Sequence, residues 1–167
     1  MTYVELHCHS AYSFLDGASQ PEELVVRAAE LGYDALALTD HDGICGSLEF
    51  ALQAKAFGVR PLTGAELTLR GGAHVTLLVE TGAGYANLCR LITSAHAETR
   101  PKPAELLPPA LDPGLLVELN DGLVCLSGCA RHGLAVRDPN AAARLARAFG
   151  PDDQLLRLRG PVEEGIG

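Results

Sequence analysis

The sequence predicts an α/β protein whose strands and helices alternate along the chain. Continuous apolar runs, such as residues 35–38 (ALAL), have the pattern of strands buried in a parallel sheet. The segments between these runs carry apolar residues at the i, i+3/i+4 and i+7 spacing of amphipathic helices. Gly32 and Gly58 each follow such a segment, where glycine favours helix termination. With 167 residues, 47% of them hydrophobic, the chain is long enough for one domain with a sizeable core.

The first elements follow from local patterns. Residues 3–8 are apolar enough for a short strand that leads into a loop. Ser19 and Glu22 have the spacing of a capping box, which predicts a helix that begins there and ends at Gly32. The run at 35–38 is then the second strand, because it is short, continuous and apolar.

The middle of the chain continues the alternation. We expect a helix over residues 44–57, a strand over 60–68 and a strand over 74–80. The pair Gly71 and Gly72 predicts a turn between these two strands.

The second half repeats the pattern with less regularity. A helix begins at 82–84, and residues 100–113 hold five prolines, which predicts a surface connection with a short helix at 105–107. Residues 123–126 form the next strand, and an Ala/Arg-rich helix follows Asp138. We expect one further strand at 154–158. Strands alternating with helices predict a parallel sheet with right-handed crossovers, either open or closed into a barrel.

Composition limits the function classes. The net charge is −8, and no run of Lys or Arg is present, so unaided electrostatic binding of nucleic acid is excluded for this chain. Bound cations can still reverse the local field and attract phosphate esters. The five cysteines are odd in number and no signal peptide is recognisable, which predicts free thiols in a reducing cytoplasm. No apolar stretch reaches the roughly 20 residues that a membrane span needs.

Two histidines at the end of the first strand are the strongest functional signal. Residues i and i+2 of a strand share a face, so His7 and His9 project to one side and Cys8 to the other. In βα-repeat folds, functional residues gather at the carboxyl ends of the strands. Further candidate ligands lie at such ends or in the loops that follow them: Asp16, Asp40, His41, Glu66 and Cys129. His96 is a further candidate, but it falls at the end of the helix that begins near Gly84 and so does not follow from this rule.

Each candidate also has a structural interpretation. His7 and His9 can be ordinary strand histidines, Asp16 an Asp-Gly turn residue, and Asp40 a cap of the following helix. The alternative for His96 is a partner of the helix dipole. Cys129 can be a small buried hydrophobe, and His41, like Asp40, a helix cap.

Glu66, His74 and His132 also need an interpretation. Glu66 lies between apolar neighbours, where an unpaired buried carboxylate is costly, so we expect a metal or a cationic partner. His74 and His132 follow no strand end, and we expect both to be surface or hydrogen-bonded structural histidines.

Cysteines 125 and 129 have no second pair for a zinc finger. Gly-rich nucleotide-binding loops and the Gly-x-Ser-x-Gly motif are absent.

Several motifs together resemble one family. ELHCHSAYSFLDGA at 5–18, LTDHD at 38–42 and GAE at 64–66 are similar to the PHP (polymerase and histidinol phosphatase) family. Gly84-Tyr85-x-Asn87-Leu88, the LNDGL sequence at 119–123 and LSG at 126–128 bring the resemblance closer to the PHP domain of bacterial C-family DNA polymerases. These include the polymerase III alpha subunit and the error-prone polymerase, between which the motifs do not decide, although the short connection at 100–123 favours the error-prone branch.

The resemblance implies a fold and a metal site. It implies a distorted (β/α)7 TIM-like barrel of the PHP type over residues 1–167, truncated before its last strand or strands. It implies two or three divalent ions of zinc, manganese or iron in the complete domain. By position, the implied metal ligands are His7, His9, Asp16, His41, Glu66, His96 and Cys129. The implied catalytic residues are His7, His9, His41 and Glu66, with Asp40 and Asp42 supporting the ligands.

Two parts of the family pattern have no counterpart here. The closing Asp-x-His ligands on the last strand do not occur after Leu158, and the polymerase core is absent. We therefore expect an incomplete domain, with little or no activity of this chain on its own.

The implied function is metal-dependent phosphoester hydrolysis, in the polymerase setting a 3′→5′ proofreading exonuclease acting on DNA 3′ ends. One alternative is a non-catalytic, metal-stabilised module of the polymerase. A second alternative is a free-standing PHP phosphatase.

Overall fold

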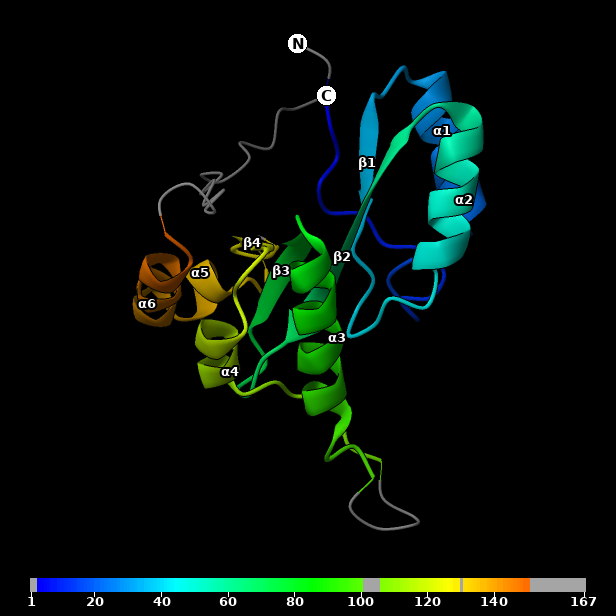
Figure 1. The fold of residues 1–167 in the computed structure, drawn as a ribbon. Coiled ribbons are helices and arrows are strands. Elements are labelled where there is room, and N and C mark those ends of the chain that lie inside the picture. Colours follow the sequence, from blue (N-terminus) through cyan, green and yellow to red (C-terminus); the bar gives the residue numbers. More distant parts are fainter. Residues whose placement is uncertain (1–2, 101–105, 130, 151–167) are drawn as a thin grey trace, which may run out of the picture.

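The computed structural model describes residues 3–100, 106–129 and 131–150 (Figure 1). The described part is α/β, as predicted. Its elements in chain order are α1 (Pro21–Glu30), β1 (Ala35–Leu38), α2 (Ser47–Phe57), β2 (Arg60–Thr68), β3 (His74–Val79), α3 (Gly82–His96), α4 (Pro113–Glu118), β4 (Leu123–Leu126), α5 (Leu134–Arg137) and α6 (Pro139–Phe149).

The four strands form one sheet in the order β1-β2-β3-β4, but the sheet is mixed rather than parallel. β1 and β2 are parallel, whereas β3 runs antiparallel to both β2 and β4. The prediction of an all-parallel sheet is therefore wrong at β3. The connection from Thr68 to His74 turns at Gly71 and Gly72, both at positive φ, and is too short to hold a crossover helix. The connection therefore forms a hairpin between β2 and β3.

The segment before β1 is not a regular strand, contrary to the prediction for residues 3–8. Within it, Glu5 alone makes a parallel bridge, to Leu36 of β1. The chain nevertheless runs beside β1, because the Thr39 N–H donates to the Cys8 carbonyl at 2.9 Å and the Cys8 N–H to the Thr39 hydroxyl at 3.0 Å. Polar pairing at the end of β1 therefore fixes this segment in place of a full ladder.

Strand bounds were more predictable than helix bounds. β2 and β4 have the predicted bounds, and β3 ends one residue early, at Val79. α1 is capped one residue later than predicted, since the Gln20 N–H, not that of Ser19, bonds the Glu23 carboxylate at 2.8 Å. α2 begins at Ser47 rather than at residue 44.

Two short helices were not predicted, and one expected helix is absent where the structure describes it. α4 is capped by the Asp112 side chain, and α5 follows Gly133. Residues 106–107 are not helical. Residue 105 and the strand predicted at 154–158 lie outside the described residues.

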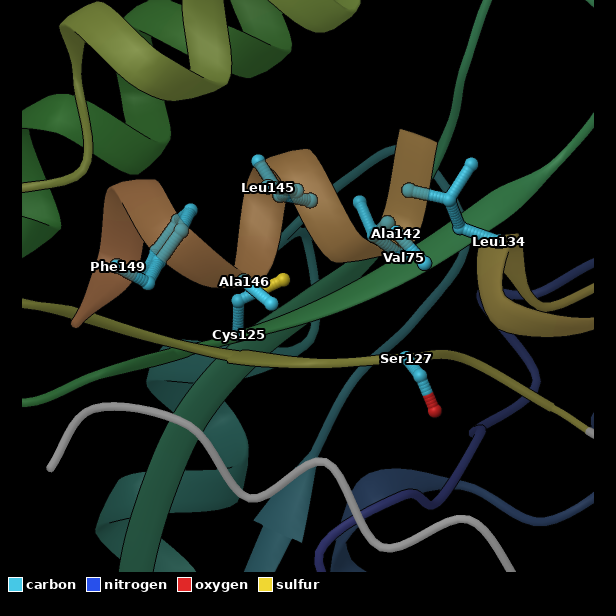
Figure 2. Close-up of a pocket in the computed structure, with 8 residues that line it drawn as sticks. All are labelled: Val75, Cys125, Ser127, Leu134, Ala142, Leu145, Ala146 and Phe149. Carbon is cyan, nitrogen blue, oxygen red and sulfur yellow. The ribbon is translucent and has the colours of Figure 1, made fainter. Parts of the chain in front are cut away.

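Two apolar clusters hold the elements together. The smaller one lies between α1, α2 and β1 and is centred on Phe50, which is fully buried. The larger one joins the sheet to α3, α4, α5 and α6. Figure 2 shows α6 against β3 and β4, with Leu145 and Phe149 beside Cys125 around a small apolar cavity. Burial raises the pKa of the Cys125 thiol to about 12, so it behaves as a packing residue.

No helix within the described residues has the length and apolar character that crossing a membrane requires.

Gly64 lies in β2 where the parallel and antiparallel halves of the sheet meet. A substitution at Gly64 tests how closely β2 packs on β3. A Cβ there would approach the Leu77 carbonyl oxygen to 2.4 Å. We expect Gly64→Ala to lower the free energy of unfolding by about 2 kcal/mol, because backbone must shift to make room. Urea denaturation measures the free energy of unfolding of the variant and of the wild type.

The control is Gly82→Ala, since a Cβ at Gly82 meets nothing within 4 Å. Equal stability of the two variants would contradict the close packing of β2 on β3.

Candidate metal centre

The centre of the site is the Glu66 carboxylate on β2. Its neighbours Ala65 and Leu67 point to the opposite face and are fully buried in the larger apolar cluster. Glu66 is itself only 1% exposed. Its carboxylate contacts the ring Nε2 of His7 and lies 2.6 Å from Nδ1 of His74. A buried carboxylate is thus surrounded by imidazoles rather than by Lys or Arg.

Two groups of potential ligands share this carboxylate. One consists of His7, His9 and Glu66, and the other of His41, Glu66 and His74. Within each group the ligand atoms lie within 4.8 Å of one another. Nε2 of His9 is 3.7 Å and Nδ1 of His41 is 3.9 Å from the nearer Glu66 oxygen. A carboxylate with two oxygens at the junction of two nitrogen-rich groups can bridge two cations.

The imidazoles follow one another in a continuous series. Ring centroids are 4.8 Å apart between His7 and His9, and 4.5 Å between His9 and His41, whose rings are stacked. His74 lies 5.3 Å from His41, and His132 lies 5.5 Å from His74. We call these five side chains the imidazole row. It draws on residues separated by more than a hundred positions in the sequence.

Electrostatics agree with this arrangement. Burial alone raises the pKa of the Glu66 carboxyl, but its hydrogen bonds with His7 and His74 and the nearby His41 outweigh burial and bring the pKa to about 2. For His9, burial and the neighbouring His41 and His7 lower the pKa. The carboxylate is therefore ionised, and His9 is favoured as neutral imidazole, the form that binds metals.

A second carboxylate, Asp40, positions the loop that carries the ligands. Asp40 is 2% exposed and accepts three hydrogen bonds of 2.7 Å, from the Ser10 N–H, the Ser10 hydroxyl and the Ser13 hydroxyl. The predicted helix-capping role is wrong, because all three donors lie in the loop after His9. Adding a Cβ at Gly17 would bring it to 1.9 Å from the Ser10 carbonyl, so the loop closes tightly on itself.

Ser13 also fixes the tautomer of His9. Its hydroxyl proton is donated to Asp40, so the oxygen can only accept from His9 Nδ1, 3.2 Å away. The proton of the neutral His9 ring then lies on Nδ1, and the Nε2 lone pair faces Nε2 of His7 at 3.1 Å and the Glu66 carboxylate at 3.7 Å. Orientation of a ligand imidazole by hydrogen bonding at its other nitrogen is typical of metal sites.

The remaining predicted site residues lie around these groups. Asp16 is exposed, with one carboxylate oxygen 3.4 Å from His41 Nε2. Asp42 accepts 2.8 Å hydrogen bonds from the N–H and hydroxyl of Thr68, so it ties the end of β1 to β2. His96 Nε2 donates to the Asp42 carbonyl at 2.8 Å. The carbonyl contact positions His96 beside the strand end that carries His41.

Cys129 lies at the far end of the row. Its Sγ accepts the N–H of His132 at 3.2 Å. Neither Cys129 nor His96 belongs to the two ligand groups found among the described residues. Their roles as ligands, like those of the other predicted residues, stay predictions.

His74 was missed, and the reason is topological. It was expected to be a surface or structural histidine because it begins a strand instead of ending one. Since β3 is antiparallel, its first residue lies at the carboxyl end of β2, where Thr68 pairs with His74. The Gly71-Gly72 pair was the signal that could have revealed this. His132, expected to be similar, lies next to His74 at the end of the row, with its ring tilted by 39° to that of His74.

The donor set fits divalent transition metals. Neutral imidazole nitrogens with an ionised bridging carboxylate suit zinc, manganese or iron, and they do not resemble an all-oxygen calcium site. The neutral His9 and the ionised Glu66 are already in the protonation states that such ions require.

Comparison with known proteins identifies the family. Residues 5–153 match the PHP domain family. The error-prone DNA polymerase of Symbiobacterium thermophilum is 42% identical over 187 aligned positions, which cover 99% of this chain and 17% of that protein. The DNA polymerase III subunit alpha of Chlamydia pneumoniae is 34% identical over 158 positions, covering 84% of this chain and 12% of that protein. The chain thus spans less than a fifth of the length of these relatives.

A solved structure shares the fold. A protein from Bifidobacterium adolescentis designated a metal-dependent phosphoesterase superposes with a TM-score of 0.66 at 13% identity, covering 88% of this chain and 74% of that one. At this identity the likeness shows the fold alone. The fold is therefore of the predicted PHP type, and the mixed four-stranded sheet is consistent with part of that barrel.

The position of His74 leads to a test of the two ligand groups. We expect His74→Ala and Glu66→Gln each to lower the affinity for manganese or zinc by at least about tenfold, because each removes a donor from the cluster. Elemental analysis of dialysed protein and calorimetric titration measure the bound metal.

Glu49→Gln is the matched control, since Glu49 is exposed on α2. Full metal content in His74→Ala, with native circular dichroism, would contradict the second ligand group.

Proposed function

The chain belongs to the PHP domain family, and we propose that it is a metal-dependent phosphoesterase domain of a bacterial DNA polymerase of the error-prone or polymerase III alpha type. The match over residues 5–153 and the polymerase relatives support the family context. The observation that carries the chemistry is the buried Glu66 carboxylate shared by two histidine groups.

The substrate we propose is the 3′ end of DNA, cleaved in the 3′→5′ direction as proofreading. A chain of net charge −8 needs bound cations to attract a polyanion, and the site offers donors for them. In a longer protein the polymerase core is then the covalent partner that supplies DNA. This part of the proposal rests on the polymerase relatives.

The residues that would hold divalent cations are His7, His9, His41, Glu66 and His74, with Asp16, His96 and Cys129 as further proposed ligands. Bound ions would supply a water of lowered pKa and neutralise phosphate oxygens. The ionised Glu66 carboxylate lies between the two groups of histidines and is shared by both. Ser13 keeps the His9 proton on Nδ1, and Asp40 keeps the loop in place.

The second candidate function is structural, with metal as a staple of the polymerase. The observation that favours it is the position of the ligands: they come from the segment before β1, from the ends of β1 and β2, and from the start of β3. Metal that joins four separate segments stabilises the fold whether or not it catalyses. The two candidates differ in one measurable result, which is turnover.

Catalysis is tested by His9→Ala. In the presence of Mn²⁺, we expect the domain, carried in the polymerase to which we propose it belongs, to shorten a 5′-labelled single-stranded DNA from its 3′ end, and His9→Ala to lower the rate by a hundredfold or more. Gel analysis of the products measures both rate and direction. Native folding of the variant is checked by circular dichroism, and Tyr85→Phe, an exposed position on α3, is the control. An unchanged rate in His9→Ala would refute the catalytic proposal.

Chelation separates the two candidates. We expect removal of bound metal to lower the melting temperature by several degrees, because a ligand that binds only the folded state stabilises it by mass action. Differential scanning calorimetry with and without EDTA measures the shift. Loss of stability on chelation, without any nuclease activity of the domain in the metal-loaded polymerase, would favour the structural candidate, and no shift at all would contradict both.

A further inference from the structure

The imidazole row continues beyond the two ligand groups to a residue that neither group uses. His132 lies in the turn after β4, with its ring 5.5 Å from that of His74. Arg137, at the end of α5, donates from a guanidinium nitrogen to Nδ1 of His132 at 2.9 Å. A cationic side chain is thereby joined to the end of a row that is otherwise imidazole and carboxylate.

The backbone fixes this pair against the metal centre. The His74 N–H donates to the His132 carbonyl at 2.8 Å, and Gly133 forms a parallel bridge with His74. Gly128 has φ +82°, and a Cβ there would lie 2.6 Å from the His74 carbonyl oxygen. The turn between β4 and α5 therefore requires glycine where it crosses the start of β3, and this close crossing sets His132 beside His74.

The hydrogen bond leaves both partners with free donors. Arginine has no acceptor, so Nδ1 of His132 must accept, and the ring proton lies on Nε2 as a donor. The guanidinium uses one of its five N–H groups in this bond. The pair therefore offers several N–H donors and no unfilled acceptor, which is the requirement for binding an oxyanion.

Arg137 is hydrogen-bonded to an imidazole of the row, not to a carboxylate. Arg27, by contrast, pairs with Glu30 and Arg70 with Asp112, each at 3.0 Å. In the described ranges, no carboxylate lies within ion-pair distance of Arg137. In a chain of net charge −8, a guanidinium left without a carboxylate beside an acidic centre is available for an anionic ligand.

We propose that His132 and Arg137 form a phosphate-binding subsite at the His74 end of the metal centre. A fork of guanidinium N–H groups matches the oxygens of a phosphate group, and the imidazole Nε2–H adds a further donor. The identity of the phosphate as part of an ester substrate rests on the function proposed above. Binding of the phosphate group itself does not, so the two can fail separately.

The test is binding of inorganic phosphate to the manganese-loaded 167-residue chain, measured by isothermal titration calorimetry. Loss of a charge-assisted hydrogen bond weakens binding by about tenfold or more, which we expect for Arg137→Gln. We expect Arg137→Lys to keep part of the affinity, because it retains the charge without the fork. Arg144→Gln, exposed on the neighbouring helix α6, is the matched control and is expected to bind like the wild type.

Metal content separates ligand binding from a structural role. We expect Arg137→Gln to retain the wild-type manganese content and, with DNA as substrate, to raise KM while kcat changes less than about twofold. Loss of manganese from Arg137→Gln would overturn the proposal, because Arg137 would then act by supporting His74 through His132. Equal phosphate affinity in wild type and Arg137→Gln would overturn it as well. Phosphate binding that depends on Arg137 without any DNA hydrolysis would leave the subsite and refute the nuclease.

Discussion

The arrangement depends on one buried charge, the carboxylate of Glu66. A carboxylate removed from water costs several kcal/mol unless it is paired and hydrogen-bonded. Here the compensation comes from His7 and His74, which approach from segments on opposite sides of β2 in the sequence. The hairpin that carries His74 and the segment beside β1 that carries His7 are thus required for Glu66 to stay ionised. The site and the fold are stabilised by the same contacts.

The sequence was sufficient for the histidines expected at the ends of parallel strands, and insufficient where the predicted strand direction was wrong. His7, His9 and His41 were expected near Glu66 because parallel segments bring their carboxyl ends together, and the structure places them there, although the segment that carries His7 and His9 is not a regular strand. His74 could not be found by that rule, which discards residues at strand starts. One reversed strand therefore hides one of the residues that contact Glu66.

The helices show a similar limit. The longer helices α1, α2, α3 and α6 carry enough periodic apolar positions to be predicted within a few residues. α4 and α5 are too short for a periodic pattern, and each is fixed by tertiary packing, through Leu116 and Leu134 respectively. α5 carries Arg137, one of the two residues of the phosphate-binding subsite proposed above. The local sequence therefore does not predict α4 and α5, because their stability comes from packing in the larger apolar cluster.

Asp40 and Glu66 show how one side-chain chemistry serves two tasks. Both are nearly inaccessible to solvent, and both lie at the carboxyl ends of neighbouring parallel strands. Asp40 meets hydroxyl and amide donors of the Ser10–Ser13 loop, which occupy its oxygens and leave it a structural anchor. Glu66 meets ring nitrogens, which can give up their protons and bind a cation instead. The donors that face a buried carboxylate, rather than its burial, therefore decide whether it holds a loop or a metal.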